Sequence, residues 1–151
     1  MSAEAELRVA DEDVELRLLL PAGRLLVSTG DVDVDATDEY PIADLAAFAT
    51  ALGRLIDFQA RGLDPFADVS DPEGLGVSTH VARDRHRPAV AFLAEGDRSG
   101  LQVRRPPGGS LRVEGVLDDQ GISVCAWVEA TPAVLADLAE QVAAALSALR
   151  A

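Results

Sequence analysis

Hydrophobic and charged residues alternate along the first part of the chain. Residues 14–18 read Val-Glu-Leu-Arg-Leu, which has the two-residue period of a strand with one buried face. Pro21-Ala22-Gly23 is typical of a turn, so 24–28 are expected to return as a second strand. Residues 31–35 alternate again, which places aspartates on one face and valines on the other. This part is therefore predicted to form strands joined by short turns.

Two stretches have the hydrophobic spacing of amphipathic helices. After Pro41, apolar residues recur every three or four positions and predict a helix at about 42–61. Thr131-Pro132 is a strong helix start, an N-cap followed by proline, and predicts a second helix at about 132–150. The tetrapeptide Ala-Asp-Leu-Ala occurs in both, at 43–46 and 136–139. The match indicates either an internal duplication or the general similarity of alanine-rich helices.

Between the two helices, the chain is predicted to form a long loop and then a meander of short strands. Proline, glycine and aspartate mark 63–76 as the loop. The strands that we expect after it are 77–82, 89–94, 101–105, 111–117 and 122–129. Consecutive short turns favour antiparallel pairing. We therefore predict an α+β fold, a mostly antiparallel sheet of about seven or eight strands with the two helices packed on it.

Length and charge limit what the chain can be. The 151 residues are enough for one domain with a sizeable core, so residues 1–151 are expected to form a single domain. There are 26 acidic residues against 13 basic ones, all arginine, for a net charge of −13. The absence of lysine excludes P-loop and Schiff-base chemistry. The negative charge argues against nucleic acid or an anionic membrane as a partner.

Residue usage also indicates a cellular location. The absence of lysine and asparagine is typical of a bacterial genome rich in G+C. A lone cysteine, Cys125, excludes an intrachain disulfide and fits a reducing cytoplasm. The N-terminus is acidic without the apolar segment of a secretory signal, and the apolar runs are too short for a transmembrane helix. A cytoplasmic protein is expected.

An acidic stretch is the first candidate site, with a basic protein as its expected partner. Its five acids are Asp31, Asp33, Asp35, Asp38 and Glu39. The first three resemble the start of a calcium loop, but Ala36 stands where glycine is needed and Ile42 where the closing glutamate is needed. No metal is therefore predicted. The acids form either a solvated strand face that discourages aggregation or a negative patch that steers a partner.

Arginines in the middle of the chain are the second candidate site. Residues 76–112 carry a net charge of +4, against −12 before them and −5 after them. Arginine beside a glycine-rich turn is suited to hold a phosphate or carboxylate. The candidate anion-binding residues are Arg83, Arg85, His86, Arg104 and Arg105. The alternative is that these arginines pair with the acidic excess elsewhere in the fold or across a dimer.

No catalytic residue is assigned. His80, His86 and Cys125 have spacings unlike any zinc module, and no cofactor is predicted. Cys125 lies in the middle of a predicted strand, where cysteine usually fills a core. Trp127 shares its face of that strand, either under a helix or at a binding surface. Motifs of serine hydrolases, zinc proteases and dinucleotide enzymes are missing, which makes an enzyme the less favoured interpretation.

The favoured hypothesis is a small acidic cytoplasmic module that binds a basic protein partner. In size, charge and element order the chain resembles the small acidic immunity proteins of bacterial toxin systems. That resemblance implies an inhibitor of a basic protein, often a nuclease. One alternative is a protein or enzyme that binds a small anion or nucleotide through the arginine-rich turns. Another is a chaperone-like or structural homodimer.

Overall fold

The computed structural model describes residues 4–61, 90–94, 99–104, 110–119 and 122–150. The first part of the described chain forms four strands and a helix: β1 (Ala5–Ala10), β2 (Glu15–Leu20), β3 (Arg24–Ser28), β4 (Asp33–Thr37) and α1 (Ala43–Ala60). The second part repeats that order with β5 (Val90–Leu93), β6 (Ser99–Arg104), β7 (Arg112–Asp119), β8 (Ile122–Glu129) and α3 (Pro132–Arg150).

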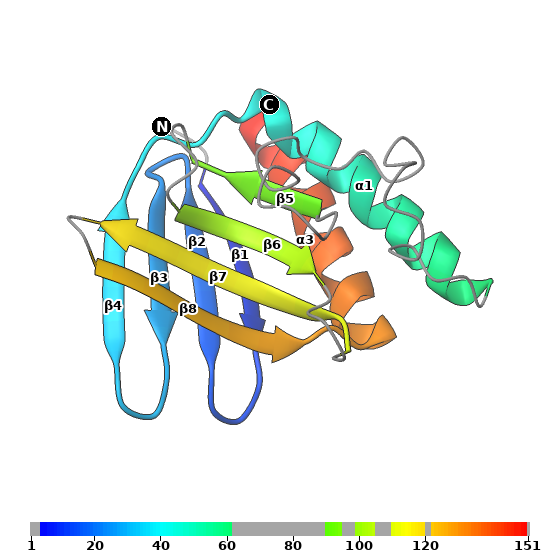
Figure 1. Cartoon of the computed structure of the whole chain (residues 1–151). Coiled ribbons are helices and arrows are strands. Elements are labelled where there is room, and N and C mark those ends of the chain that lie inside the picture. The colour runs from blue at the N-terminus through cyan, green and yellow to red at the C-terminus, as the bar shows by residue number, and fades with distance from the viewer. Residues whose placement is uncertain (1–3, 62–89, 95–98, 105–109, 120–121, 151) are drawn as a thin grey trace.

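The strands form two antiparallel sheets of four, each a simple meander. Their orders are β1-β2-β3-β4 and β5-β6-β7-β8. The predicted α+β class and antiparallel pairing are thus confirmed, with the strands divided between two sheets. The two sheets lie one in front of the other with their strands crossing, and the helices lie together along one side (Figure 1).

Strand alternation gives each sheet a buried inner face. In the first sheet, Leu7, Leu18 and Leu25 are opposite one another across three strands and are fully buried. The second sheet contributes residues such as Phe92 and Leu101, also fully buried. Both inner faces and both helices belong to one hydrophobic cluster. Burial of this apolar surface is the main force that holds the sheets together.

The sheets approach closely where β7 crosses β2. Gly115 of β7 lies over Leu16, and a Cβ at this glycine would be only 2.7 Å from the leucine Cδ2. A residue with a side chain would therefore push the sheets apart or displace the leucine. The crossing point lies near the start of β2.

The helices cover the edges of the two sheets that meet on their side. α1 and α3 pack on each other, α3 packs along β1, and α1 packs along β5. The predicted N-cap is formed, since Thr131 Oγ1 accepts a hydrogen bond from the Val134 N–H at 3.2 Å. Leu45 and Leu138 are both fully buried in this layer.

Helix boundaries agree with the predictions to within a residue, whereas two strand predictions needed correction. Residues 5–10 form β1, although we read the start of the chain only as an acidic segment. β4 begins at Asp33, so Asp31 and Val32 lie in the preceding turn and not on the faces of a strand. The predicted loop 63–76 and strand 77–82 lie outside the described residues.

The repeated tetrapeptide does not occupy equivalent positions in the two helices. Ala43 is the first residue of α1, whereas Ala136 is the fifth residue of α3. The repeat of four strands and a helix is therefore a feature of the architecture, and the four-letter match adds nothing to it.

Within the described residues, α3 is the one helix that is long and apolar enough to cross a membrane. The expectation that all apolar runs are too short is therefore wrong on length and composition. In the structure, α3 places Leu135, Leu138, Val142 and Ala145 in the core. A core helix passes the same length and composition test, so this observation is weak support for a membrane span.

Candidate functional site

Two hairpin turns bring five exposed acids together at one end of the first sheet. The register pairs Ala10 with Glu15 and Ser28 with Asp33, and in a four-stranded meander these two turns lie at the same end. Both turns project from the lower end of that sheet in Figure 1. We call this set the acidic tip; it consists of Asp11, Glu12, Asp13, Asp31 and Asp33.

Each turn of the acidic tip is held by a side chain of its own. Asp11 Oδ1 accepts hydrogen bonds from the N–H groups of Asp13, at 2.7 Å, and Val14, at 2.8 Å. In the other turn, Thr29 Oγ1 accepts one from the Asp31 N–H at 3.3 Å. These Asx-type and ST-type turns fix the loops, so the acids are presented on an ordered scaffold. Among the described residues, no group of acids, histidines or cysteines is arranged to hold a metal ion.

The structure divides the predicted acidic patch. Asp31 and Asp33 belong to the acidic tip, but Asp35 is paired with Arg24 across the outer face of the sheet, with 2.8 Å between the Arg24 Nε and a carboxylate oxygen. Glu39 is exposed on the connection to α1. Sequence reasoning missed the contribution of the β1–β2 turn. The run Asp-Glu-Asp at 11–13 was the available signal.

Asp38, the remaining acid of the predicted patch, belongs to a polar contact between the two halves of the fold. Its carboxylate accepts a hydrogen bond from the Ser99 hydroxyl at 2.9 Å, and the Tyr40 hydroxyl lies 3.1 Å from the same serine oxygen. Burial raises the pKa of Tyr40 to about 12; the hydrogen bond to Ser99 lowers it, and the charge of Asp38 adds to the rise. This acid therefore has a structural role.

The Tyr40 contact predicts a loss of stability in alkali. Because the pKa of Tyr40 is raised from 10 to about 12, the folded protein keeps its proton where the unfolded chain loses it. The contribution of this proton to the free energy of unfolding is therefore fully present below pH 10. It is lost as the pH rises toward 12, and the total loss is about 2–3 kcal/mol. Since Tyr40 is the only tyrosine, the ultraviolet absorbance of tyrosinate measures its pKa directly. The prediction fails if Tyr40 titrates near pH 10 in the folded protein.

One residue of the predicted anion-binding set lies in the described structure. Arg104 is on the outer face of β6, 3.9 Å from the carboxylate of Glu114 on β7. Its Nε is buried and has no hydrogen-bond partner among the described residues. The other members lie outside the described residues: Arg83, Arg85, His86 and Arg105. Anion binding by this set stays a prediction.

A buried carboxylate organises the outer face of the second sheet. Only 2% of the Glu114 side chain is exposed. It accepts a hydrogen bond from Gln102 Nε2 at 2.6 Å and one from Arg112 Nε at 2.7 Å. A charged group this deeply buried needs such partners, because desolvation is costly. Glu114 thereby fixes the position of the Arg112 guanidinium.

Arg112 in turn lies over the ring of Trp127 on β8. Its guanidinium carbon is 4.8 Å from the ring centroid, within the range of a cation–π contact. Trp127 is 47% exposed, so the alternative that it lies under a helix is wrong. Exposed tryptophan and arginine are the residue types that contribute most strongly to protein interfaces.

Cys125 lies beside this pair and is not the core residue that its place in the sequence suggested. The residue is exposed on the outer face of β8. Partial burial of its thiol, followed by the nearby charge of Glu114, raises its pKa. A raised pKa leaves little thiolate at neutral pH, which does not favour a nucleophilic role.

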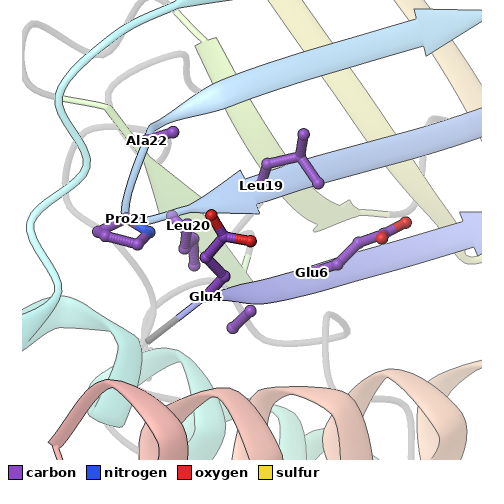
Figure 2. Close-up of a pocket in the computed structure, with 7 residues that line it drawn as sticks. Glu4, Glu6, Leu19, Leu20, Pro21 and Ala22 are labelled. Atoms are coloured by element: carbon purple, nitrogen blue, oxygen red, sulfur yellow. The ribbon is translucent and has the colours of Figure 1, made fainter. Parts of the chain in front are cut away.

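A hollow of about 550 Å³ lies at the end of the first sheet opposite to the acidic tip (Figure 2). Leu19, Leu20 and Pro21 form one side of it, and Glu4 and Glu6 another. The Glu6 carboxylate is already bonded to Arg17 at 2.7 Å, and this bond lowers its pKa. One of its two carboxylates is therefore already paired, and we assign the hollow no function.

The chain matches no protein-family model, no curated protein and no solved structure. Its function is therefore argued from the geometry of the acidic tip and of the outer face of β8.

Proposed function

We propose that this protein is a small acidic interaction module that binds a basic protein partner through the acidic tip. The observation that supports this most directly is the gathering of five exposed acids, four on two ordered turns and Asp33 at the start of β4. No arginine occurs in 10–14 or 29–33, so neither turn contains a positive charge that would offset its acids. A local field of one sign accelerates the association of an oppositely charged protein.

The distribution of ion pairs also supports a specialised tip. On the outer face of the first sheet, acids are paired with arginine: Arg8 with Glu15, Arg17 with Glu6 and Arg24 with Asp35. Acids of the tip make no such pairs with the arginines that the structure describes. The tip is thus a concentrated negative surface beside an electrically balanced one. By covering a cationic surface on its partner, such a tip would act as an inhibitor, in the manner of an immunity protein.

The first experiment identifies the partner and then tests the tip. The tagged protein is captured from a lysate of its native host, and we expect a basic protein that dissociates as salt rises. Its association rate is then measured with the triple variant Glu12→Gln, Asp13→Asn, Asp31→Asn. Loss of three tip charges is expected to slow association by about tenfold at low salt, because steering of this size is typical.

A second triple variant separates the tip from net charge. Glu4→Gln, Glu39→Gln and Glu140→Gln remove the same number of exposed acids elsewhere. We expect this control to change the association rate by about twofold at most, since distant charges are screened. Asp11 is kept in both variants because its carboxylate holds the first turn. Equal slowing in both triple variants would remove the tip from the mechanism.

A further inference from the structure

The two sheets have four edges, and three of them are covered or charged. At β1, Gln141 of α3 accepts a hydrogen bond from the Arg8 N–H at 2.6 Å and donates one to the Arg8 carbonyl oxygen at 2.8 Å. The helix thus covers this edge and satisfies the backbone groups of Arg8. α1 packs along β5. β4 is short, and Asp33 and Asp35 place charges on it. Covering or charging an edge is how proteins prevent it from pairing with another strand.

Among the residues that the structure describes, none covers the fourth edge, β8, and its sequence carries little charge. It is eight residues long and reads Ile-Ser-Val-Cys-Ala-Trp-Val-Glu, with a single charge at Glu129. Among the described elements, β7 is the one that packs extensively along it. A long edge strand that is mostly apolar and carries one charge, at its end, is well suited to pair with an added strand.

The register shows which backbone groups of β8 are available. The Ala130 N–H donates to the Leu111 carbonyl at 2.9 Å, and the pairing with β7 continues without a bulge. In an antiparallel ladder, hydrogen-bonded residues alternate with residues whose N–H and C=O point the other way. Even-numbered residues of β8 therefore bond to β7. The residues that direct N–H and C=O to the free edge are Ser123, Cys125, Trp127 and Glu129, all exposed.

The acidic tip indicates the chemistry of the strand that would pair there. β7 crosses β2 at Leu16, near the end of the first sheet that carries the acidic tip. β8 lies beyond β7, on the side of the two turns (Figure 1). The turns extend past the free edge of β8. A strand added to β8 would thus direct alternate side chains toward the tip. The other side chains would lie beside Trp127 on the outer face.

We propose that the free edge of β8 takes up an extended segment of the basic partner as a fifth strand of the second sheet. The segment alternates basic residues, which face the acidic tip, with apolar residues, which lie against Trp127. This inference rests on the proposed function, because the tip supplies the charge complementarity. Main-chain hydrogen bonds then contribute affinity, and the alternation fixes the register.

A designed peptide tests the pairing without knowledge of the partner. The probe is a capped eight-residue peptide that alternates arginine and valine and matches β8 in length. We expect its binding to slow hydrogen exchange at the amides of Ser123, Cys125, Trp127 and Glu129 by about tenfold or more. Amides of Val124, Ala126 and Val128 are already bonded to β7, so their exchange changes less. A peptide with glutamate in place of arginine is expected not to bind.

Two controls separate strand pairing from attraction of charge. A version of the peptide with N-methyl groups on its valines, whose N–H groups would face β8 in the antiparallel pairing, keeps its charge but cannot form that ladder. We expect it to bind at least about tenfold more weakly. Cys125→Pro removes one outward N–H of β8 without breaking its bonds to β7, whereas Cys125→Ser keeps that N–H. We expect the proline variant alone to lose peptide affinity.

Each result has a definite meaning, even if the proline variant does not fold, because exchange and the N-methylated peptide use the unmodified protein. Equal binding of both arginine peptides without slower exchange on β8 overturns strand addition and leaves the tip as a charge-only site. Absence of binding by either peptide also overturns strand addition. The proposed function is tested separately: it fails if the tip triple variant associates with the captured basic partner at the unmodified rate, or if the control triple variant slows association equally.

Discussion

Replacing Gly23 with alanine is expected to destabilise the protein by about 3 kcal/mol or more, a large part of the stability of a small domain. Gly23 has a φ of +76°, a conformation that costs other residues energy. A Cβ at this position would also overlap the backbone carbonyl oxygen of Asp38. The main chain at Asp38 is held against the glycine by a hydrogen bond, in which the Asp38 N–H donates to the Gly23 carbonyl at 3.0 Å. The midpoint and slope of urea unfolding measure the loss.

Gly53→Ala is the matched control, because it makes the same chemical change with the opposite expected sign. Gly53 is exposed within α1, and a Cβ there meets nothing within 4 Å. Alanine is the better helix former, so we expect a gain of about 0.5–1 kcal/mol. If both variants shifted the urea midpoint in the same direction, the local account of Gly23 would be wrong.

The effect of Gly23→Ala should extend beyond its own turn. The glycine fixes the backbone at Asp38, whose carboxylate accepts the hydrogen bond from Ser99. Ser99 also contacts Tyr40, which packs on Phe92 with 5.5 Å between ring centroids. This polar link joins the first sheet to the second. Its disturbance should therefore also move the Tyr40 titration back toward an ordinary tyrosine.

Secondary structure could be predicted where it depends on local spacing. The apolar positions of 42–61 and 132–150 have helical spacing, and Thr131 is placed where an N-cap is needed, so both helices were found. β1 was missed although Glu6, Leu7, Arg8 and Val9 alternate. Charge at the start of a chain resembles a solvated tail, and only pairing with β2 makes the alternation a strand.

The division into two sheets depends on contacts that no local pattern shows. The close approach of Gly115 to Leu16 joins residues far apart in the chain, and a glycine in a strand has several explanations before the structure is known. The acidic tip also depends on residues that are far apart in the chain. Asp11 and Asp31 are twenty positions apart, and only a meander of defined turns brings their loops to one end.

The burial of individual polar residues could not be predicted from the sequence either. Glu114 and Glu129 both lie on the outer face of the second sheet, yet the first is buried and the second is exposed. The difference comes from neighbours across the strands, because Gln102 lies opposite Glu114 and Arg112 turns its guanidinium toward it.

Glu114→Ala is expected to cost about 3 kcal/mol, because removal of one member of a buried ion pair leaves the other uncompensated. Arg112 and Gln102 both lose their bonds to this carboxylate. This loss lies at the low end of the range for breaking a buried ion pair. The reason is that the side chains of Arg112 and Arg104 are 24% and 29% exposed and can reach water. Urea unfolding measures the loss, and the fluorescence of Trp127, the only tryptophan, reports whether Arg112 still covers the ring.

Glu15→Ala is the control on the other sheet. Glu15 also pairs with an arginine on an outer strand face, at 2.7 Å from Arg8, but the two side chains are 35% and 54% exposed. An exposed pair of this kind contributes at most about 1 kcal/mol. Similar losses in the two variants would show that Glu114 is no more than a surface charge. A large loss of stability in Glu114→Ala alone, with altered Trp127 fluorescence, would show that the Glu114 carboxylate positions Arg112 over Trp127 on the β8 surface that we propose for the partner.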